Sequence, residues 1–566
     1  MSGEHVLICV AWPYANGPLH LGHVAGCYLP PDIQARFERA KGNRVLMVSG
    51  SDEHGTPITV TAETQGISPQ EVVDKYHAIN TKALLDLGCT WEPNIDPRGV
   101  EFGGSLFNRT SDPEHYKIVS ENFLSLMNAG LFERKVMQQY YEVREDGGRF
   151  LPDRYVEGEC PNCGADDARG DQCDECGVTY EANELKNPRS KMNPNAKIEI
   201  RDTEHFFYRL DLFQKALEEH ASHRQSVWKS NVRAMTKQWL DMGLRPRAVT
   251  RDLDWGIPLP LEGDEWDGKC IYVWFEAVQG YYSCAKLWSQ RHADEGDWEK
   301  WWKISEDGEK PRHLYFLGKD NIPFHALFWP AQLMGVEDKI GQSPLHLPDD
   351  IPANQYVTFK GGKASASRGV GLTISQGLER YQPDALRYAL AANFPEQADT
   401  EISDDEIIRR INEELVANWG NLVNRVLAMT YKNAEQAIPT AGELTEEDEQ
   451  LLLLVDTALQ KANSQLHQVE LRAALRTAME SAKEANKYLN ATEPWKVLKT
   501  DKERGLTILY VALSAINGIR VMFAPFLPFS SQDLDTMLGE TTGWVREDLK
   551  PGTALSKPKP LFQKVE

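Results

Sequence analysis

The sequence predicts an α/β protein in which a parallel sheet is interrupted by a cysteine-rich insertion and followed by a helical bundle. Three observations support this prediction: a strand–helix–strand pattern in residues 5–50, four clustered cysteines in residues 160–176, and helical periodicity from about residue 400 to the end. Strand, helix and strand within about 45 residues is the signature of a parallel sheet.

The first elements follow from apolar runs and turn residues. Residues 5–12 and 43–50 are predicted to be buried strands, and residues 31–41 carry Ile33, Phe37 and Ala40 on one helical face. Proline cannot stand inside a helix without breaking it. We therefore expect a break at residues 30–31, with Pro31 in the first turn of the helix that follows.

Residues 140–200 are rich in Gly, Asp, Asn and Pro, which indicates an insertion. The apolar runs 271–275 and 313–317 then predict that strands of the sheet resume. Residues 286–302 carry four tryptophans among charged residues and are predicted to form a surface excursion.

The last third of the chain is predicted to be helical. Residues 451–489 place apolar residues three and four apart, and residues 506–523 form a second helix that stops before Pro525 and Pro528. The stretches 1–115 and 251–345 are expected to form the two halves of the sheet domain. The other expected divisions are the insertion 116–250, a connecting region 346–400 and the helical domain 401–566.

Composition limits the class of protein. With 566 residues, 41% of them hydrophobic and 26% charged, the chain is expected to fold as several globular domains. No signal peptide is expected, and no apolar run is expected to approach the roughly 20 residues of a membrane-spanning helix. We therefore expect a soluble cytoplasmic protein. A net charge of −22 argues against nucleic-acid binding, but local basic patches on an acidic protein can still bind RNA.

Four of the nine cysteines form two CxxC pairs separated by nine residues. Each pair can direct both sulfurs at one point, as tetrahedral zinc requires, and four thiolates complete the coordination sphere. The alternative is four ordinary reduced thiols. The spacing predicts one structural Zn²⁺ bound by Cys160, Cys163, Cys173 and Cys176.

His20 and His23 lie in WPYANGPLHLGH, where the first strand gives way to a helix. A helix N-terminus attracts anions through its free N–H groups and its dipole. Histidines at i and i+3 share one helical face, and Gly22 leaves the backbone open to close approach by a flat base. A lone HxxH more often caps a helix, but this context favours a nucleotide-phosphate site.

The string HLGH resembles the HIGH motif of class I aminoacyl-tRNA synthetases. AWPYANGPLHLGH, SGSDEHGTPI, the paired CxxC knuckles, VWFEAVQGY, GKDNIPFHALFWP and NLVNR resemble the methionyl members of that family and occur in the family's order. The resemblance covers residues 5 to about 500. It implies a Rossmann-like catalytic domain, an anticodon-binding helical bundle, and ATP-dependent joining of L-methionine to tRNA(Met), with Mg²⁺ accompanying the ATP.

The family's second signature, KMSKS, resembles KGGKASASRG here. Lys363, Ser365 and Ser367 match, whereas Ala366 stands where many members have the second lysine and Ala364 where they have methionine or an aromatic residue. Loss of a lysine that neutralises pyrophosphate charge could cost about 2–4 kcal/mol in the transition state. The alternative is a basic surface loop.

The resemblance also assigns roles to single residues. His20, His23 and Lys363 would contact the phosphates, and Arg251 would assist activation. Arg251 has the alternative of a surface ion pair with Asp252 or Asp254. The ATP contacts implied by the resemblance are Gly22, Gly318, Asp320, Lys363, Ser365, Ala366 and Ser367.

The amino-acid pocket should be apolar with a few polar atoms, and aromatic residues suit a polarisable thioether. Asp52 would hold the ammonium group, although it could simply cap a turn. Each aromatic residue could alternatively belong to the core. Trp12 and Val278 depart from residues common in the family. The positions implied are Trp12, Tyr14, Asp52, Trp274, Ala277, Val278, Tyr281 and His325.

Asn421 and Arg425 share a helical face, and Pro494-Trp495 follows a long helix. The resemblance implies that Asn421, Arg425, Pro494 and Trp495 read the anticodon by stacking and by hydrogen bonds to base edges. The alternatives are interhelical packing for the amide–arginine pair and a bundle-capping role for Trp495.

The sequence also allows other functional assignments. The enzymes for leucine, isoleucine or valine carry a large editing domain, for which residues 116–250 are too few, and the enzyme for cysteine needs an open zinc position. A non-catalytic tRNA-binding paralogue is favoured only by KASAS. The chain ends soon after the bundle, so we expect a monomer, with no membrane partner.

Overall fold

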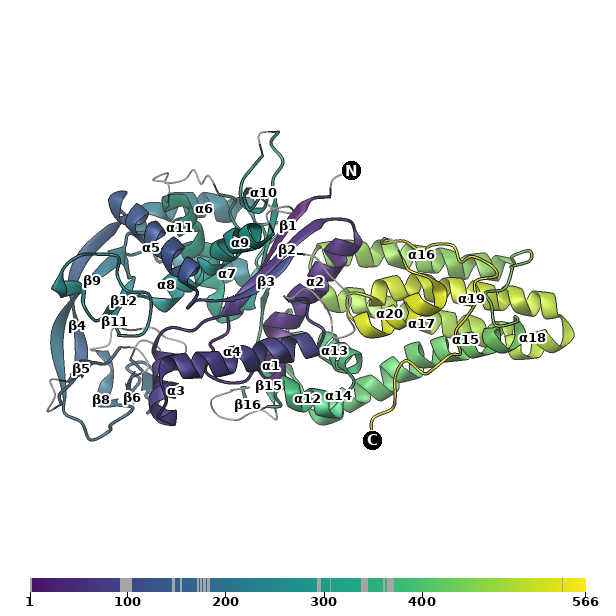
Figure 1. Ribbon diagram of the computed structural model, residues 1–566, viewed down its shortest axis with the longest axis horizontal. Helices are drawn as coiled ribbons and strands as arrows, with labels where there is room; N and C mark the ends of the chain where they lie inside the picture. Colours follow the sequence, from purple (N-terminus) through teal and green to yellow (C-terminus); the bar gives the residue numbers. More distant parts are fainter. Residues whose placement is uncertain are drawn as a thin grey trace.

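The computed structural model describes most of the chain (Figure 1). The described residues are 3–91, 104–144, 148–152, 155–170, 173, 176, 180, 184–292, 297–305, 307–336, 345–359, 362–363, 371–541 and 543–566, with 362–363 described for the backbone alone.

A parallel sheet organises the N-terminal half. Within the described residues its order is β14-β13-β1-β2-β3, and every neighbouring pair is parallel. Such a sheet is covered on both faces, so its strands are apolar throughout. The predicted fold class is thereby confirmed. The strands are β1 (His5–Val10), β2 (Arg44–Ser51), β3 (Ser105–Arg109), β13 (Arg312–Gly318) and β14 (Ala353–Asn354).

Alternate residues of β1 belong to two different cores. Val6 and Ile8 pack in the cluster that extends into the C-terminal helices, and Leu7 and Cys9 pack in a second cluster on the other face. The helices that accompany the sheet and its crossovers are α1 (Leu21–His23), α2 (Leu29–Ala40), α3 (Thr56–Gln65), α4 (Pro69–Asp86), α5 (Pro113–Asn128), α8 (Val273–Ala277), α9 (Gly280–Arg291), α10 (Glu299–Trp302) and α11 (Trp329–Gly335).

The break expected at Pro30-Pro31 is a change of helix type. A π-helical turn, η1 (Val24–Tyr28), joins α1 to α2, and the two prolines stand in the first turn of α2. Proline lacks the N–H that an interior helical residue donates, and the wider turn before it accommodates that loss. A second π turn, η7 (Phe324–Phe328), precedes α11.

Two expectations for residues 269–302 are wrong. The run 271–275 is not a strand of the parallel sheet: β12 (Lys269–Ile271) pairs with β11 (Thr250–Asp252), Cys270 also bridges Pro258, and α8 begins at Val273. The tryptophan-rich stretch is not a surface excursion, because Trp288, Trp301 and Trp302 are buried in the second core. The rings of Trp301 and Trp302 pack against His5 on β1 and His313 on β13.

The insertion is built on a long antiparallel ribbon of β4 (Phe132–Glu142) and β9 (Ile198–Tyr208). Figure 1 shows it as a layer beyond the parallel sheet. The cysteines accompany a small three-stranded sheet. The remaining elements are β5 (Arg149–Phe150), β6 (Val156–Glu159), β7 (Ala168–Arg169), β8 (Lys186–Ser190), η4 (Leu210–Phe213), α6 (Gln214–His223), α7 (Ser230–Asp241), β10 (Arg247–Ala248) and η5 (Asp264–Trp266).

The C-terminal half is a helical bundle (Figure 1). The periodic run 451–489 forms two helices rather than one, because Val469 adopts φ 54° and turns the chain back. Its elements and those leading to it are η6 (Lys319–Asn321), β15 (Val357–Phe359), β16 (Gly362–Lys363), α12 (Ile374–Arg380), α13 (Pro383–Ala392), β17 (Thr400–Glu401), α14 (Asp404–Arg409), η9 (Arg410–Gly420), α15 (Asn421–Asn433), α16 (Glu446–His467), α17 (Leu471–Thr492), α18 (Pro494–Thr500), α19 (Lys502–Phe523) and α20 (Pro528–Leu538).

Contrary to the expectation that no run approaches spanning length, α19 is long and apolar enough to cross a membrane by length and composition. It ends before Pro525 as predicted, and 89% of its most apolar window is buried inside the fold. Its apolar surface is therefore covered by the other bundle helices.

A buried ion pair joins the two halves. Arg387 on α13 donates to Asp32 on α2 at 2.7 Å, and neither side chain is exposed. Arg387 also donates to the carbonyls of Pro525 and Phe526, between α19 and α20. Burial alone would raise the pKa of Asp32, but Arg36 and Arg387 outweigh it and bring the pKa to about 2.

Replacing Arg387 by leucine should cost about 3–5 kcal/mol of unfolding free energy, because Asp32 would remain buried with less positive charge beside it. Urea unfolding followed by circular dichroism measures this. Arg380→Leu, which breaks an exposed pair with Asp404, is the control and should cost less than about 1 kcal/mol. Equal losses in the two variants would contradict the structural role of Arg387.

Candidate functional site

His20 and His23 cap each other at the carboxyl edge of the sheet. The backbone N–H of His23 donates to His20 Nδ1 at 3.2 Å, and that of His20 donates to His23 Nδ1 at 3.3 Å. The rings stack with centroids 3.6 Å apart and an interplanar angle of 18°. The two imidazoles thus form one rigid unit.

The capping bonds also fix the tautomers. Each Nδ1 accepts a hydrogen bond, so each neutral ring carries its proton on Nε2. Burial lowers the pKa of His20 to about 4, which keeps this imidazole neutral at pH 7. His20 Nε2 is buried and has no hydrogen-bond partner among the described residues. It is an N–H donor available to a ligand.

The free backbone amides expected here are not all free. The N–H of Leu21 donates to the Leu372 carbonyl at 2.9 Å, and that of His23 is used by His20. An anion at this site would therefore be bound by the imidazole N–H groups more than by the backbone N–H groups.

The stem of the KMSKS-like loop lies against this unit. Besides the Leu21–Leu372 bond, the N–H of Ile374 donates to the Leu19 carbonyl at 3.1 Å, and Phe359 contacts the His20 ring edge-on at 6.4 Å. Residues 359 and 371 flank the loop, so both of its ends stand beside His20. Within the loop, the backbone of Lys363 pairs with Thr358. Ser365, Ala366 and Ser367 lie outside the described residues.

The GKD segment lies at the end of β13. Gly318 pairs with Asn354, Asp320 accepts a hydrogen bond from the Tyr356 hydroxyl, and Lys319 lies over the Tyr356 ring at 3.9 Å. Tyr356 immediately precedes β15. Gly318 and Asp320 are thus joined to the strand that leads into the loop, and Gly22 is buried in α1 on the same side of the sheet.

Trp12, Tyr14, Trp274, Tyr281 and His325 are here called the aromatic wall, and four of these residues form two hydrogen-bonded pairs. Trp274 Nε1 donates to the Tyr14 hydroxyl at 2.5 Å, and the Tyr281 hydroxyl donates to His325 Nε2 at 2.8 Å. His325 Nδ1 donates to the Asn321 carbonyl, which fixes this tautomer, and burial lowers the pKa of His325 to about 4. Ala277 and Val278 are buried in α8 and its C-terminal end.

Asp52 is buried at the end of β2, beside Tyr14. Its N–H donates to the Pro13 carbonyl at 2.8 Å, and its carbonyl accepts from Ala15 at 2.9 Å. The carboxylate is therefore held next to the aromatic wall by the backbone.

Trp12 fills space left by two glycines. A Cβ on Gly280 would lie 2.4 Å from Trp12 Cζ2, and one on Gly50 would lie 2.3 Å from Cζ3. Neither contact is possible for a real side chain. The bulk of Trp12, noted as a departure from the family, is thus matched by small residues on β2 and α9.

Arg251 stacks on Tyr272, with its guanidinium 4.0 Å from the ring centre, and donates to the carbonyls of Ala248 and Thr250. Asp252, its suggested partner, is bound instead by His205 and Lys269. Arg251 therefore lies on the β11–β12 ribbon that leads to Trp274.

In the bundle, Arg425 lies 5.4 Å from the centre of the Trp495 ring and donates to Asn490 at 3.5 Å. Asn421 is exposed one helical turn before Arg425, and Pro494 begins α18. Of the positions expected to read the anticodon, Arg425 on α15 and Trp495 on α18 thus lie side by side.

The four cysteine sulfurs lie within 4.8 Å of one another. The Cys160–Cys176 and Cys163–Cys173 sulfurs are 3.8 and 3.6 Å apart, close to the roughly 3.8 Å edge of a tetrahedron with Zn–S bonds of about 2.3 Å. The N–H groups of Asn162 and Cys163 point to the Cys160 sulfur at 3.4 Å. The cluster can hold a metal ion and suits zinc.

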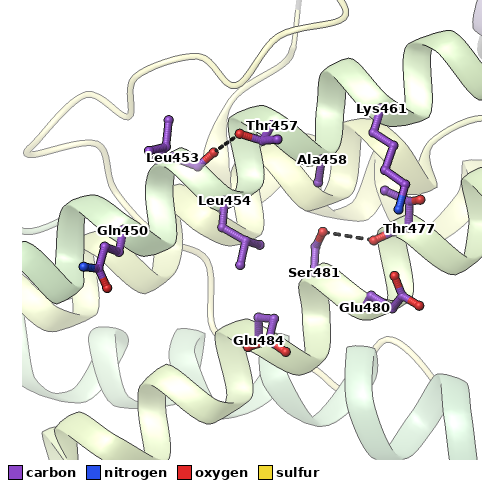
Figure 2. Close-up of a pocket in the computed structure, with 10 residues that line it drawn as sticks. All are labelled: Gln450, Leu453, Leu454, Thr457, Ala458, Lys461, Thr477, Glu480, Ser481 and Glu484. Atoms are coloured by element: carbon purple, nitrogen blue, oxygen red, sulfur yellow. Dashed lines mark hydrogen bonds between the residues drawn. The ribbon is translucent and has the colours of Figure 1, made fainter.

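Two large cavities lie away from these residues. One of about 600 Å³ runs between α16 and α17, where Figure 2 shows Leu454 and Ser481 projecting toward it from opposite helices. Another of about 680 Å³ is bounded by α3, β5 and Trp255. None of the predicted site residues lines either cavity.

Comparison with known proteins identifies the family. The family described as class I tRNA synthetases (M) matches residues 6–427, and the anticodon binding domain of methionyl tRNA ligase matches residues 438–566. The chain belongs to the methionine–tRNA ligase family. This membership confirms the resemblance noted in the sequence and makes the chain an ATP-dependent ligase.

Curated relatives agree over their full length. Methionine–tRNA ligase of Roseiflexus sp. strain RS-1 is 44% identical over 596 aligned positions, covering 100% of this chain and 97% of the relative. The Chloroflexus aggregans enzyme of the same name is 42% identical with the same coverage. The function as a methionine–tRNA ligase follows from these matches.

Solved structures share the fold. Mycobacterium tuberculosis methionyl-tRNA synthetase bound by methionyl-adenylate superposes with a TM-score of 0.78 at 23% identity, covering 99% of this chain and 100% of that one. Its apo form gives a TM-score of 0.70 at 24% identity, with coverages of 100% and 99%.

Replacing Gly280 by alanine should destabilise the protein by about 1–3 kcal/mol, because the new methyl group overlaps Trp12. Adding Trp12→Leu to the same chain should recover most of the loss. Gly26→Ala is the matched control, since no atom lies within 4 Å of its Cβ position. Thermal unfolding measures all three, and a neutral Gly280→Ala would show that Trp12 is not confined there.

Proposed function

We propose that the ligase works in two steps. L-Methionine first reacts with ATP to give methionyl-adenylate and pyrophosphate, and the methionyl group then moves to the 3′ end of tRNA(Met). The observation that carries this proposal is the His20–His23 unit, whose Nε2 donors lie beside the stem of the KMSKS-like loop. Family membership supports the same chemistry.

The first step needs no protein nucleophile. The methionine carboxylate attacks the α-phosphorus, a P–O bond forms, and the bond to pyrophosphate breaks. Negative charge grows on the phosphate oxygens, and fixed N–H donors stabilise that charge without reorganising. We assign this role to His20 and His23, assisted by Lys363 and Arg251.

The remaining ATP contacts are proposed for residues around the same edge. Gly22 and Gly318 are proposed to give a flat base close access to the backbone. Asp320 is proposed to bind the ribose, and its hydrogen bond from Tyr356 supports this by holding the carboxylate in one position. Ser365, Ala366 and Ser367 are proposed to cover the phosphates. Mg²⁺ bound with ATP would neutralise phosphate charge.

The amino-acid pocket is proposed to hold the ammonium group at Asp52 and the thioether against aromatic rings. The wall of Trp12, Tyr14, Trp274, Tyr281 and His325 supports this, because its polar atoms largely bond to each other and leave apolar faces for the ligand. Ala277 and Val278 complete the wall.

Asn421, Arg425, Pro494 and Trp495 are proposed to bind the anticodon of tRNA(Met). The arginine and the indole are already adjacent, so an unstacked base could lie on Trp495 while Arg425 donates to its edge. The matched anticodon domain supports this assignment at the level of the domain.

The division at residues 115, 250, 345 and 400, and a monomeric state, are also proposed. The cysteine cluster is proposed to bind one structural Zn²⁺, which would fix the two knuckles to one another.

The activity is tested by ATP–pyrophosphate exchange with a panel of amino acids. Exchange should depend on methionine. Silence with every amino acid, alongside tRNA binding, would instead indicate a non-catalytic paralogue, and dependence on another amino acid would overturn the substrate. Restoring the family's lysine with Ala366→Lys should raise kcat if the native loop lacks a phosphate contact.

His20→Asn separates capping from catalysis. Asparagine can still accept from the His23 N–H but has no donor at the Nε2 position, so stability should change little. The exchange kcat should fall by about 10²–10³-fold, the usual effect of losing a transition-state donor. His223→Ala, exposed on α6, is the control. An unchanged kcat in His20→Asn would remove His20 from the mechanism.

The purified protein should contain one zinc per chain by inductively coupled plasma mass spectrometry. Cys173→Ser should lose the metal and unfold at lower temperature, because three thiolates cannot close the site. Cys89→Ser, a buried cysteine elsewhere, should keep the zinc. Full zinc content in Cys173→Ser would show that the cluster is not the site.

A further inference from the structure

A buried carboxylate lies beneath the proposed amino-acid pocket, held between two imidazoles. Glu276 Oε1 lies 2.7 Å from His54 Nδ1, and Oε2 lies 2.8 Å from His115 Nε2. The side chains of Glu276 and His115 are fully buried and that of His54 is 1% exposed. Sequence analysis assigned no role to these three residues.

The protons of this cluster can be placed from its bonds. An ionised carboxylate only accepts, so His54 and His115 each donate to Glu276. The other nitrogen of His54 lies 2.7 Å from the Tyr116 hydroxyl, and that of His115 lies 2.8 Å from Ser283 Oγ. Burial alone would raise the pKa of Glu276, but the two imidazoles outweigh it and the pKa lies below its ordinary value.

Each member sits next to a residue proposed to bind methionine. Glu276 follows Trp274 by two positions in α8, and His54 follows Asp52 by two positions after β2. His115 comes from α5, and the Trp12 ring stacks over it at 6.2 Å and 26°. One carboxylate therefore connects the segments that carry Asp52 and Trp274 with the helix on which Trp12 stacks.

Stability alone does not account for this arrangement. A buried ionic cluster is on average no more stabilising than apolar residues of the same volume, and breaking it leaves an uncompensated charge. A network of directional hydrogen bonds does, however, fix the distance between the segments that it joins. Here those segments are the Asp52 loop, α8 and the helix under Trp12.

We propose that His54, Glu276 and His115 are positioning residues for methionine binding. The inference rests on the proposed pocket: the network sets the spacing of Asp52, Trp274 and Trp12, and thereby the affinity for the amino acid. None of the residues proposed to contact ATP belongs to this network, so the affinity for ATP should depend little on it.

The test uses steady-state exchange kinetics on the full chain. His115→Leu removes the bond to Glu276, whereas His115→Gln can keep an N–H donor at the Nε2 position. We expect the KM for methionine to rise about tenfold or more in His115→Leu, with kcat and the KM for ATP within about threefold of wild type, as for one lost bond to a charged group. His115→Gln should restore the methionine KM to within about threefold.

Two further variants guard against misfolding and unspecific effects. Glu276→Gln keeps the shape of the side chain and removes the charge, and it should raise the methionine KM about threefold or more while remaining folded. His313→Leu removes a fully buried histidine at the opposite edge of the sheet, where it bonds the Trp301 carbonyl at 2.5 Å. It should lower thermal stability and leave the methionine KM unchanged.

The outcomes separate this inference from the proposed function. If the wild type exchanges with methionine and folded His115→Leu and Glu276→Gln keep its KM, the positioning role is wrong and the function stands. If KM for methionine and ATP rise together, or glutamine does not rescue, the network is merely structural. If the wild type shows no methionine-dependent exchange, it is the proposed function that fails.

Discussion

Two backbone hydrogen bonds between residues 19–21 and 372–374 fix the turn that carries His20 against the segment after the KMSKS-like loop, where we propose that the phosphates bind. They join the turn after β1 to the segment that follows the KMSKS-like loop, although more than 350 residues separate the two in sequence. Because the turn stands at the carboxyl edge of a parallel sheet, the loop is anchored where such sheets bind ligands. This junction holds the imidazoles of His20 and His23 next to the segment that follows the loop.

A buried ion pair joins the sheet domain to the helical bundle. Arg387 binds Asp32 and the chain between α19 and α20, so the catalytic sheet and the bundle share one continuous core. Figure 1 shows α15 and α18 of the bundle well apart from α1, and the buried ion pair joins the two halves. Since we propose that the protein contacts both the anticodon and the 3′ end of one tRNA, a fixed spacing between the domains would serve this function as well as the fold.

Sequence patterns predicted the structural features that depend on a few neighbouring residues. The apolar runs of β1, β2 and β13, the two CxxC knuckles and the end of α19 before Pro525 are each written in a few neighbouring residues. The prediction of a strand at residues 271–275 was wrong because a short apolar run fits a buried helix as well as a strand. Only the packing of α8 decides between the two. The prediction for Trp301 and Trp302 was wrong because the charged residues around them suggested a surface position, whereas both side chains pack into the second core. The resemblance supplied the proposed site residues, but it did not predict the mutual capping of His20 and His23. It also missed His54, Glu276 and His115, which lie up to 222 residues apart and have no shared spacing to detect.

We infer that the stacked imidazoles of His20 and His23 receive the phosphates of ATP. A crystal structure of the protein with methionine and a non-hydrolysable ATP analogue tests this most directly. The account predicts phosphate oxygens within about 3 Å of the Nε2 atoms of His20 and His23, with the loop closed over them. A triphosphate bound elsewhere, with His20 Nε2 facing no ligand atom, would contradict it.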